Sequence, residues 1–117
     1  MDDKYKMMVY ICSPYKGDID VNVEKARKYC RWATDRNCIA IAPHLLFPQF
    51  MSEETEREEA LYNGKVLLAK CDEVWAMGDT VSEGMRDELV FATRLKKRIR
   101  YFSDKEVAED AGYDLRS

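Results

Sequence analysis

This chain has only one histidine and no closely spaced pair of cysteines. Its 117 residues include one histidine and four cysteines, and Cys12, Cys30, Cys38 and Cys71 form no C-x-x-C pair. Structural zinc sites need four such ligands at short spacings, so no metal centre is expected. Scattered cysteines without partners are typical of reduced thiols, which predicts a cytoplasmic protein.

Long apolar runs and basic clusters are also missing. No stretch is long and apolar enough to cross a membrane, and we expect no signal peptide. The net charge is -3 and the longest basic run is Lys96-Lys97-Arg98, so the sequence does not indicate a nucleic-acid-binding surface. Without linkers or repeats, residues 1–117 are predicted to form a single domain with a hydrophobic core.

Short apolar segments alternate with helical segments along the chain. Strands buried on both faces are predicted over residues 7–12, 38–42, 73–78 and 99–102. Helices are predicted from about Asp20, Ser52, Ser82 and Ser103. This alternation predicts an α/β fold, a doubly wound parallel sheet of four to five strands with helices on both faces, Rossmann-like or flavodoxin-like. Residues 44–50 are expected to form a loop.

Ligands of such sheets bind beyond the carboxyl ends of the strands. Three segments of this chain meet that description, residues 13–18, 43–44 and 78–88, and the polar residues concentrate there. The first loop is not G-x-G-x-x-G and no Walker A pattern occurs. Ordinary dinucleotide or nucleoside-triphosphate binding is therefore not indicated, and no cofactor is expected.

The helix that starts at Ser82 carries the main candidate residues. Ser82 is a good N-cap, and Gly84 lets a ligand approach the backbone closely. Glu88 falls within the apolar stripe of this helix, where an ionised carboxylate is costly unless it has a partner or borders a cavity. Glu88 is therefore either a nucleophile or base, or a carboxylate that pairs with Lys16 or Arg86.

Other residues at the strand ends have both a functional and an ordinary interpretation. The helix start suits a phosphate or other anion, and Lys16 could add charge. The alternative is an ordinary N-cap beside a solvated lysine. His44 could hold a ligand group, and Tyr15 and Phe47 could stack on a planar base, or all three could be packing residues. We expect Tyr10 in the core and do not expect a nucleophilic thiol at Cys12.

Three motifs together resemble the nucleoside 2-deoxyribosyltransferase-like superfamily. They are Val9-Tyr10-Ile11-Cys12-Ser13-Pro14-Tyr15-Lys16-Gly17, then Ala42-Pro43-His44, and then Ser82-x-Gly84-x-x-x-Glu88-Leu89-x-x-Ala92. Within the superfamily, the chain looks closest to a branch of small proteins from bacteria and their viruses, similar to 2'-deoxynucleoside 5'-monophosphate N-glycosidases.

The resemblance implies a nucleoside or nucleotide as the small-molecule partner, and commonly a homodimer with sites near the subunit contact. The glutamate matching Glu88 attacks the anomeric carbon, and water or a second base resolves the glycosyl-enzyme. Nucleoside-specific relatives carry an acidic residue at the position of Ser82, whereas those that hydrolyse nucleotides carry serine. The implied substrate-binding residues are Ser13, Tyr15, Lys16, Gly17, His44, Phe47, Asp79, Ser82 and Gly84.

One position departs from the family pattern. Active members usually carry an Asp eight residues ahead of the acidic residue that opens the third strand. Here Asp72 is that acidic residue and Gly64 stands at the earlier position. Asn63 cannot act as a base, and Asp79 could substitute only if its loop folds inward.

The sequence therefore supports three hypotheses. The first is an enzyme that cleaves or exchanges the N-glycosidic bond of a 2'-deoxynucleoside 5'-monophosphate. The second is a non-catalytic nucleotide-binding module, a sensor or scavenger, as the missing Asp would favour. The third is a scaffold, supported only by Trp32, which lies off its helix stripe, and by the apolar segment 44–50.

Overall fold

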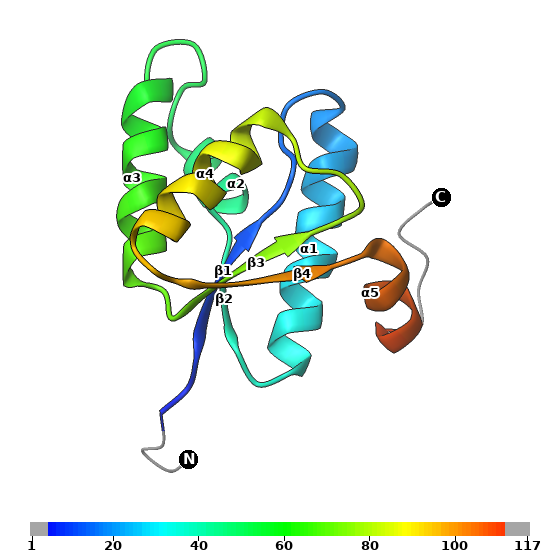
Figure 1. The fold of residues 1–117 in the computed structure, drawn as a ribbon. Coiled ribbons are helices and arrows are strands. Elements are labelled where there is room, and N and C mark those ends of the chain that lie inside the picture. The colour runs from blue at the N-terminus through cyan, green and yellow to red at the C-terminus, as the bar shows by residue number, and fades with distance from the viewer. Residues whose placement is uncertain (1–4, 112–117) are drawn as a thin grey trace.

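A four-stranded parallel sheet forms the centre of the protein. The computed structural model describes residues 5–111. The strands are β1 (Met8–Cys12), β2 (Ile39–Ile41), β3 (Glu73–Met77) and β4 (Arg98–Phe102). They run in the order β2-β1-β3-β4, and each neighbouring pair is parallel (Figure 1). The predicted α/β class and parallel sheet are confirmed.

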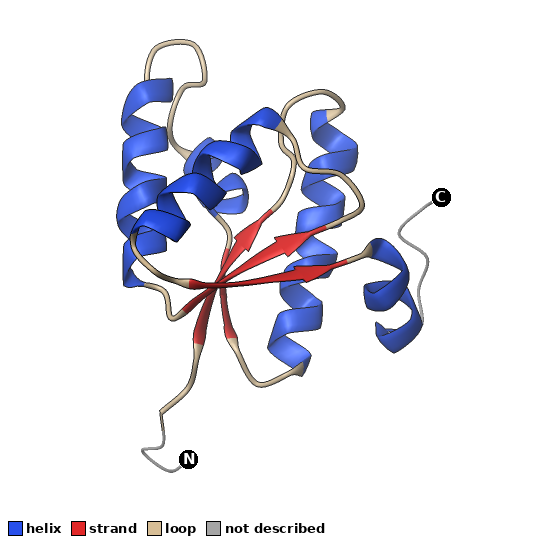
Figure 2. Cartoon of the chain, in the orientation of Figure 1, coloured by secondary structure: helices blue, strands red, loops and turns tan. Residues whose placement is uncertain are grey.

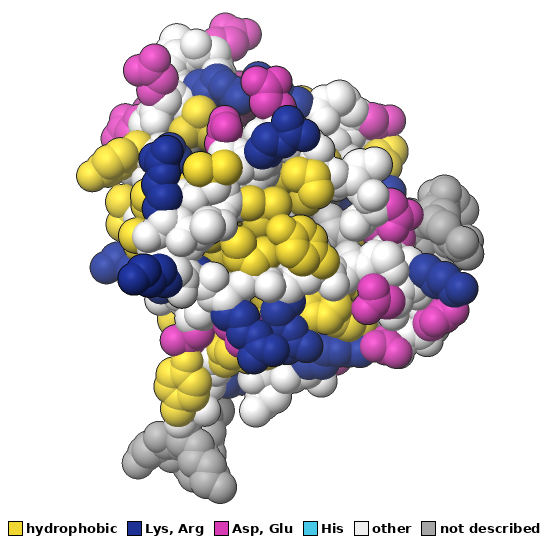
Figure 3. Space-filling view, viewed as in Figure 1, with side chains coloured by type: hydrophobic (Ala, Val, Ile, Leu, Met, Phe, Trp, Pro, Cys, Tyr) yellow, Lys and Arg dark blue, Asp and Glu magenta, His cyan; other side chains and the backbone are white. Residues whose placement is uncertain are grey.

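Helices cover both faces of the sheet (Figure 2). α1 (Ile19–Asp35) and α5 (Asp104–Ala111) pack on one face, and α3 (Arg57–Lys70) and α4 (Glu83–Arg94) pack on the other. The chain from β2 to α3 forms the short helix α2 (Pro43–Leu46) and a 3₁₀ turn, Phe47–Gln49. Figure 3 shows apolar side chains gathered over α4 and β4, with lysine and arginine side chains beside them.

Side-chain alternation along β1 divides the core into two parts. Val9 and Ile11 point toward α1 and α5, where they join one buried cluster. Tyr10 and Cys12 point the other way and join the cluster under α3 and α4. Successive side chains of a strand point to opposite faces, so Tyr10 and Cys12 must share a face. That face is also the one that α4 covers.

Three expectations about the elements are wrong in detail. Residues 44–50 are not a loop, because Pro43, at the first helical position, has a preset φ that favours a helical turn. Asp18 rather than Asp20 caps α1, with its carboxylate accepting a hydrogen bond from the Val21 backbone at 3.3 Å. The acidic segment from Ser52 forms a turn, and α3 begins only at Arg57.

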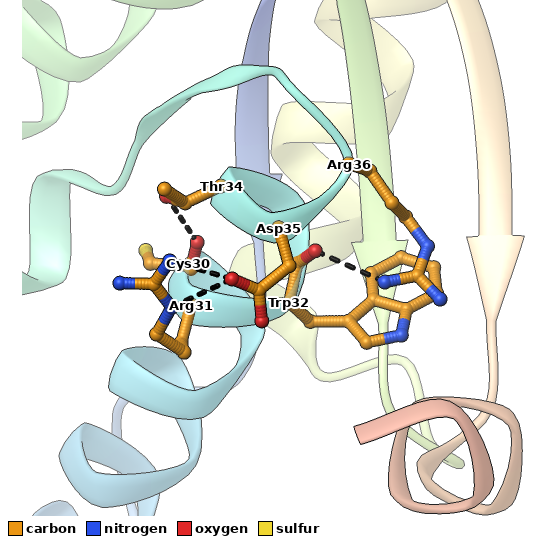
Figure 4. A network of polar contacts seen from close by, with 6 residues as sticks. All are labelled: Cys30, Arg31, Trp32, Thr34, Asp35 and Arg36. Atoms are coloured by element: carbon orange, nitrogen blue, oxygen red, sulfur yellow. Dashed lines mark hydrogen bonds and ion pairs between the residues drawn. The ribbon is translucent and has the colours of Figure 1, made fainter.

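Trp32 lies in the core and not at the surface. It is 3% exposed and packs edge-on against Trp75 and Phe102, with ring centroids 5.8 and 4.8 Å away. The Arg36 guanidinium covers its ring at 3.6 Å and donates a hydrogen bond to the Trp32 carbonyl (Figure 4). The off-stripe position therefore reflects packing against the aromatic side chains of β3 and β4, and the scaffold hypothesis loses this support.

The last helix has the predicted capping box. The Ser103 hydroxyl accepts a hydrogen bond from the Glu106 backbone at 3.1 Å, and the Glu106 carboxylate accepts one from the Ser103 backbone at 3.1 Å. Gly112, the predicted end of this helix, lies outside the described residues. Among residues 5–111, no helix is both long enough and apolar enough to span a bilayer.

Candidate functional site

A cavity of about 440 Å³ opens at the carboxyl ends of β1 and β2. Its walls come from the loop after β1, from α2 and the 3₁₀ turn, from α3 and from the first two turns of α4. The volume is in the range of roughly 300–1,000 Å³ that small-molecule sites occupy. Seven of the predicted site residues line it, together with Glu88: Ser13, Tyr15, Lys16, His44, Phe47, Ser82 and Gly84.

Glu88 is held in place by two side chains of β1. The Tyr10 hydroxyl donates a hydrogen bond to one carboxylate oxygen, Oε2. The Cys12 thiol donates to the other, Oε1, with an S–O distance of 3.4 Å. No contact pairs Glu88 with Lys16 or Arg86 among the described residues, so its partners are neutral donors and not cations.

Burial dominates the electrostatics of this group. It raises the pKa of the Glu88 carboxyl above its usual 4.5; the Tyr10 and Cys12 hydrogen bonds offset part of that rise, and the Asp87 charge adds to it. Burial, together with the Glu88 charge, also raises the pKa of Tyr10 and of Cys12. Both therefore stay protonated and donate to Glu88, and a nucleophilic Cys12 thiolate is disfavoured.

The N-terminus of α4 faces the same cavity. The Ser82 hydroxyl accepts a hydrogen bond from the Met85 backbone at 3.2 Å, which confirms it as the N-cap. Its own hydroxyl proton is left to donate elsewhere. A side-chain carbon added at Gly84 would have no heavy atom within 4 Å, so the backbone here is open to an approaching group. This arrangement suits an anion.

A stacked aromatic pair forms another wall. The rings of Tyr15 and His44 lie 4.7 Å apart with an angle of 20° between their planes. Burial lowers the pKa of His44 from 6.5, and a hydrogen bond to the Ser13 backbone and the Glu53 charge offset part of this shift. The imidazole is therefore neutral at pH 7. Phe47 lines the cavity nearby and packs edge-on against Phe50.

Ser13 has a polar group with no protein partner. It is 2% exposed, lines the cavity, and its hydroxyl oxygen makes no hydrogen bond with the described residues. A buried hydroxyl without a partner costs about 1–3 kcal/mol. A bound ligand that reaches Ser13 would recover that free energy.

Gly17 and Asp79 do not line the cavity. Gly17 adopts φ 99° in the turn before α1. Asp79 lies in a second hollow, on the α1 and α5 side, where its carboxylate accepts a hydrogen bond from the Asp104 backbone at 3.0 Å. Its loop is tied to α5 and does not fold inward, so Asp79 cannot replace the Asp that is missing at Gly64.

The sequence interpretation missed Tyr10 and the charged residues of α3. Tyr10 contacts Glu88, although its β1 position had suggested only a core role. The sequence did contain an indication of this contact. Tyr10 and Cys12 are two positions apart on one strand, so both side chains point to the same face, which is the face that α4 covers. Arg57 and Lys65 also line the cavity, but no sequence feature distinguishes them from solvated residues.

Gly64 stands on the α3 wall directly beside Tyr10. A side-chain carbon added there would lie 3.5 Å from the Tyr10 hydroxyl and 3.9 Å from the Pro43 ring. These are ordinary van der Waals distances, so a larger residue would fit and would face the partner of Glu88. Among the described residues, no cluster of three or more His, Cys, Asp or Glu side chains could hold a metal ion.

The strand order and the cavity together define a flavodoxin-like α/β protein with a candidate small-molecule site at the carboxyl edge of its sheet. The chain belongs to the family DUF7768, described as a domain of unknown function, which it matches over residues 7–102.

The fold is similar to that of a 2-deoxyribosyltransferase from the psychrotolerant bacterium Bacillus psychrosaccharolyticus. The TM-score is 0.60 and the identity 24%, over 82% of this chain and 72% of that chain. None of the curated proteins matches the sequence. At this identity the likeness shows a shared fold, and the superfamily and its narrower branch stay predictions.

Proposed function

We propose that the protein cleaves or exchanges the N-glycosidic bond of 2'-deoxynucleoside 5'-monophosphates, with Glu88 as the nucleophile. One observation carries the proposal: a half-buried carboxylate borders the cavity, and neutral donors from β1 hold both of its oxygens. Two fixed hydrogen bonds restrict the rotation of the carboxylate, which is the preorganisation that nucleophilic attack requires.

In this mechanism a Glu88 oxygen attacks the anomeric carbon while the bond to the base breaks. The resulting glycosyl ester is then released by water, as in a hydrolase, or by a second base, as in a transferase. Tyr10 and Cys12 are positioning residues because they contact Glu88 and hold its orientation. The burial that raises the pKa of Glu88 also leaves the ionised form poorly solvated and therefore more reactive.

The rest of the cavity suits the other parts of a nucleotide. The Ser82 hydroxyl, the open backbone at Gly84 and the Lys16 ammonium would hold the phosphate. The stacked Tyr15 and His44 rings, with Phe47, would contact the base.

A second candidate function is a non-catalytic nucleotide-binding module. It is favoured by Gly64, because the α3 wall beside Tyr10 then carries no carboxyl group. Such a module would keep the phosphate and base contacts and lack turnover.

The test is incubation with each deoxynucleoside monophosphate, followed by chromatography for free base. We expect base release by the native protein and none by Glu88→Ala. Glu59→Ala, at an exposed position of α3, is the matched control and should keep full activity. Tight binding without base release by the native protein would instead establish the second candidate.

We further propose a cytoplasmic homodimer. Leu61, Tyr62 and Val66 expose large apolar side chains on α3, beside the cavity. Sedimentation equilibrium would show a mass of twice 13.7 kDa. A monomer at micromolar concentration would contradict this part of the proposal.

A further inference from the structure

Among the described residues, the α3 wall of the cavity carries no carboxylic acid that could protonate a departing base. A side-chain carbon added at Gly64 would lie 3.5 Å from the Tyr10 hydroxyl, so Gly64 is the α3 residue that faces the partner of Glu88. A neutral base leaves its sugar readily only when a positioned acid supplies a proton. The first question about substrate choice is therefore where that proton would come from.

The other titratable groups of the cavity are not placed for this task. Glu53 forms an ion pair with Arg57 at 3.0 Å on the exposed side of the cavity. Burial keeps His44 neutral, and its ring is stacked on Tyr15. Glu83 and Asp87 are exposed residues on α4, the helix that carries the nucleophile itself.

We propose that the preferred substrate is a nucleoside 5'-phosphate whose leaving ring already carries a positive charge, as a pyridinium ring does. This inference rests on the proposed glycosidase function of Glu88. A pyridinium nitrogen has no need of a proton when its bond to the sugar breaks, so the missing acid costs such a substrate nothing.

The charges of the cavity fit this class of ligand. Four carboxylates line it, Glu53, Glu83, Asp87 and Glu88, against the three cations Lys16, Arg57 and Lys65. This lining has an excess of one negative charge, which favours a cationic ring over a neutral one, and the Tyr15 ring offers such a ring cation–π contact. The 5'-phosphate would meet Lys16 and the α4 N-terminus.

The reaction balances without a proton donor. A Glu88 oxygen forms a bond to the anomeric carbon, and the electron pair of the carbon–nitrogen bond moves onto the pyridinium nitrogen. The ring leaves as a neutral pyridine. Water then attacks the glycosyl ester, and a proton of that water passes to solvent. This step releases a sugar 5-phosphate and regenerates the Glu88 carboxylate.

The 2'-deoxy forms of nicotinamide mononucleotide and of its reduced counterpart make a matched pair of probes. They have nearly the same size and the same phosphate, but only the oxidised ring is cationic. We expect nicotinamide release from the oxidised probe and none from the reduced one. The kcat/KM for the oxidised probe should exceed the kcat/KM for the best of the four deoxynucleoside monophosphates by about a hundredfold. That factor is the lower end of what a general acid contributes.

Variants at Gly64 test whether the lack of a proton donor on the α3 wall causes the preference for a cationic leaving ring. Gly64→Asp places an acid beside Tyr10, where the distances leave room, and should raise kcat/KM for the deoxynucleoside monophosphates. Gly64→Asn has the same size without the acid and should not raise it. Thermal melting would first establish that both variants are folded, and Glu88→Gln should abolish release from every substrate.

The possible outcomes separate this inference from the proposed function. Cleavage of the deoxynucleoside monophosphates at rates equal to or above that of the oxidised probe would overturn the inference and leave the proposed function standing. Nucleotide binding without cleavage of any probe would overturn both and leave the binding module. Release that survives Glu88→Gln would also overturn both.

Discussion

The two oxygens of Glu88 differ in the strength of the hydrogen bonds that they accept. Tyr10 donates an O–H bond to Oε2, whereas Cys12 donates a weak S–H bond to Oε1 at 3.4 Å. A strongly hydrogen-bonded oxygen is less nucleophilic, so under the proposed mechanism Oε1 is the oxygen better prepared to attack. Tyr10 then fixes the carboxylate, while Cys12 orients it at little cost in reactivity.

Tyr10→Phe should shift the acidic limb of the pH–rate profile. The Tyr10 hydrogen bond lowers the pKa of Glu88, so its loss raises that pKa further. Because the proposed attack needs the ionised carboxylate, kcat/KM should start to decline at a higher pH than in the native protein. Tyr29→Phe removes a buried hydroxyl on the opposite face, bonded to Asp104, and should leave the limb in place. An unchanged limb in Tyr10→Phe would contradict the positioning role.

Glu88 also predicts a dependence of stability on pH that requires no activity. Its pKa is raised in the folded protein, so between 4.5 and that higher value the folded state binds more protons than the unfolded state. Stability contributed by this group is therefore present below 4.5 and lost as pH rises through the folded pKa.

Glu88→Gln removes this loss, and the difference in Tm between variant and native protein should grow in the variant's favour as pH rises through that window. Differential scanning calorimetry over a pH series measures it. Glu54→Gln, at an exposed turn position, is the solvent-exposed reference. A constant difference across the series for Glu88→Gln would show that the carboxylate is not desolvated.

At the scale of elements, α4 combines a structural cap with a candidate anion site. Ser82→Ala removes the cap of α4 and should lower the free energy of unfolding by about 1 kcal/mol. Ser103→Ala removes the equivalent cap of α5, and we expect a similar loss. Only the first variant should weaken nucleotide binding, as measured by isothermal titration calorimetry.

Ser82→Asp separates the two roles of this residue. Aspartate is also a good N-cap, so the stability of α4 should be retained. Its negative charge would repel a phosphate, and the affinity should move away from nucleotides toward the unphosphorylated nucleosides. Unchanged nucleotide affinity in Ser82→Asp would place the phosphate elsewhere.

Elements with strong local signals could be predicted from the sequence. The buried strands β1 and β3, the Ser82 and Ser103 caps and the inward position of Glu88 each follow from a pattern of a few residues. The prediction of burial is wrong for β2 and β4, whose residues are half-buried or exposed because these strands lie at the edges of the sheet. The helix over residues 43–46 was missed because its local signal, Pro43 at the first helical position, was interpreted only as the end of the preceding strand. Tyr10 lies in the core as predicted, but its contact with Glu88 was not predicted, because the two residues lie 78 positions apart in the chain.

At the scale of the whole molecule, the sheet separates two sets of interactions. The cavity lies on the α3 and α4 side, whereas the aromatic cluster of Trp32 and the buried carboxylate of Asp104 lie on the α1 and α5 side. Parallel order puts all carboxyl ends at one edge of the sheet, and both the predicted site segments and the cavity lie at that edge. The position of Asp79 on the α1 and α5 side depends on its hydrogen bond with the Asp104 backbone of α5, which the sequence does not indicate.

Asp104 joins three elements on the side away from the cavity. Its carboxylate accepts a hydrogen bond from the Tyr29 hydroxyl at 2.5 Å and pairs with Lys25 at 3.4 Å, and its backbone donates to Asp79. Asp104→Ala removes the acceptor of a buried tyrosine hydroxyl, which should lower the free energy of unfolding by about 1–3 kcal/mol.

The matched control lies on the same helix. Asp110→Ala breaks only the exposed ion pair with Arg36, which should cost less than about 1 kcal/mol. Urea unfolding would measure both losses, and calorimetry would measure nucleotide affinity under native conditions. Because the sheet lies between Asp104 and the cavity, the affinity of both variants should equal that of the native protein. A weaker affinity in Asp104→Ala alone would show that the second hollow, and with it Asp79, takes part in ligand binding after all.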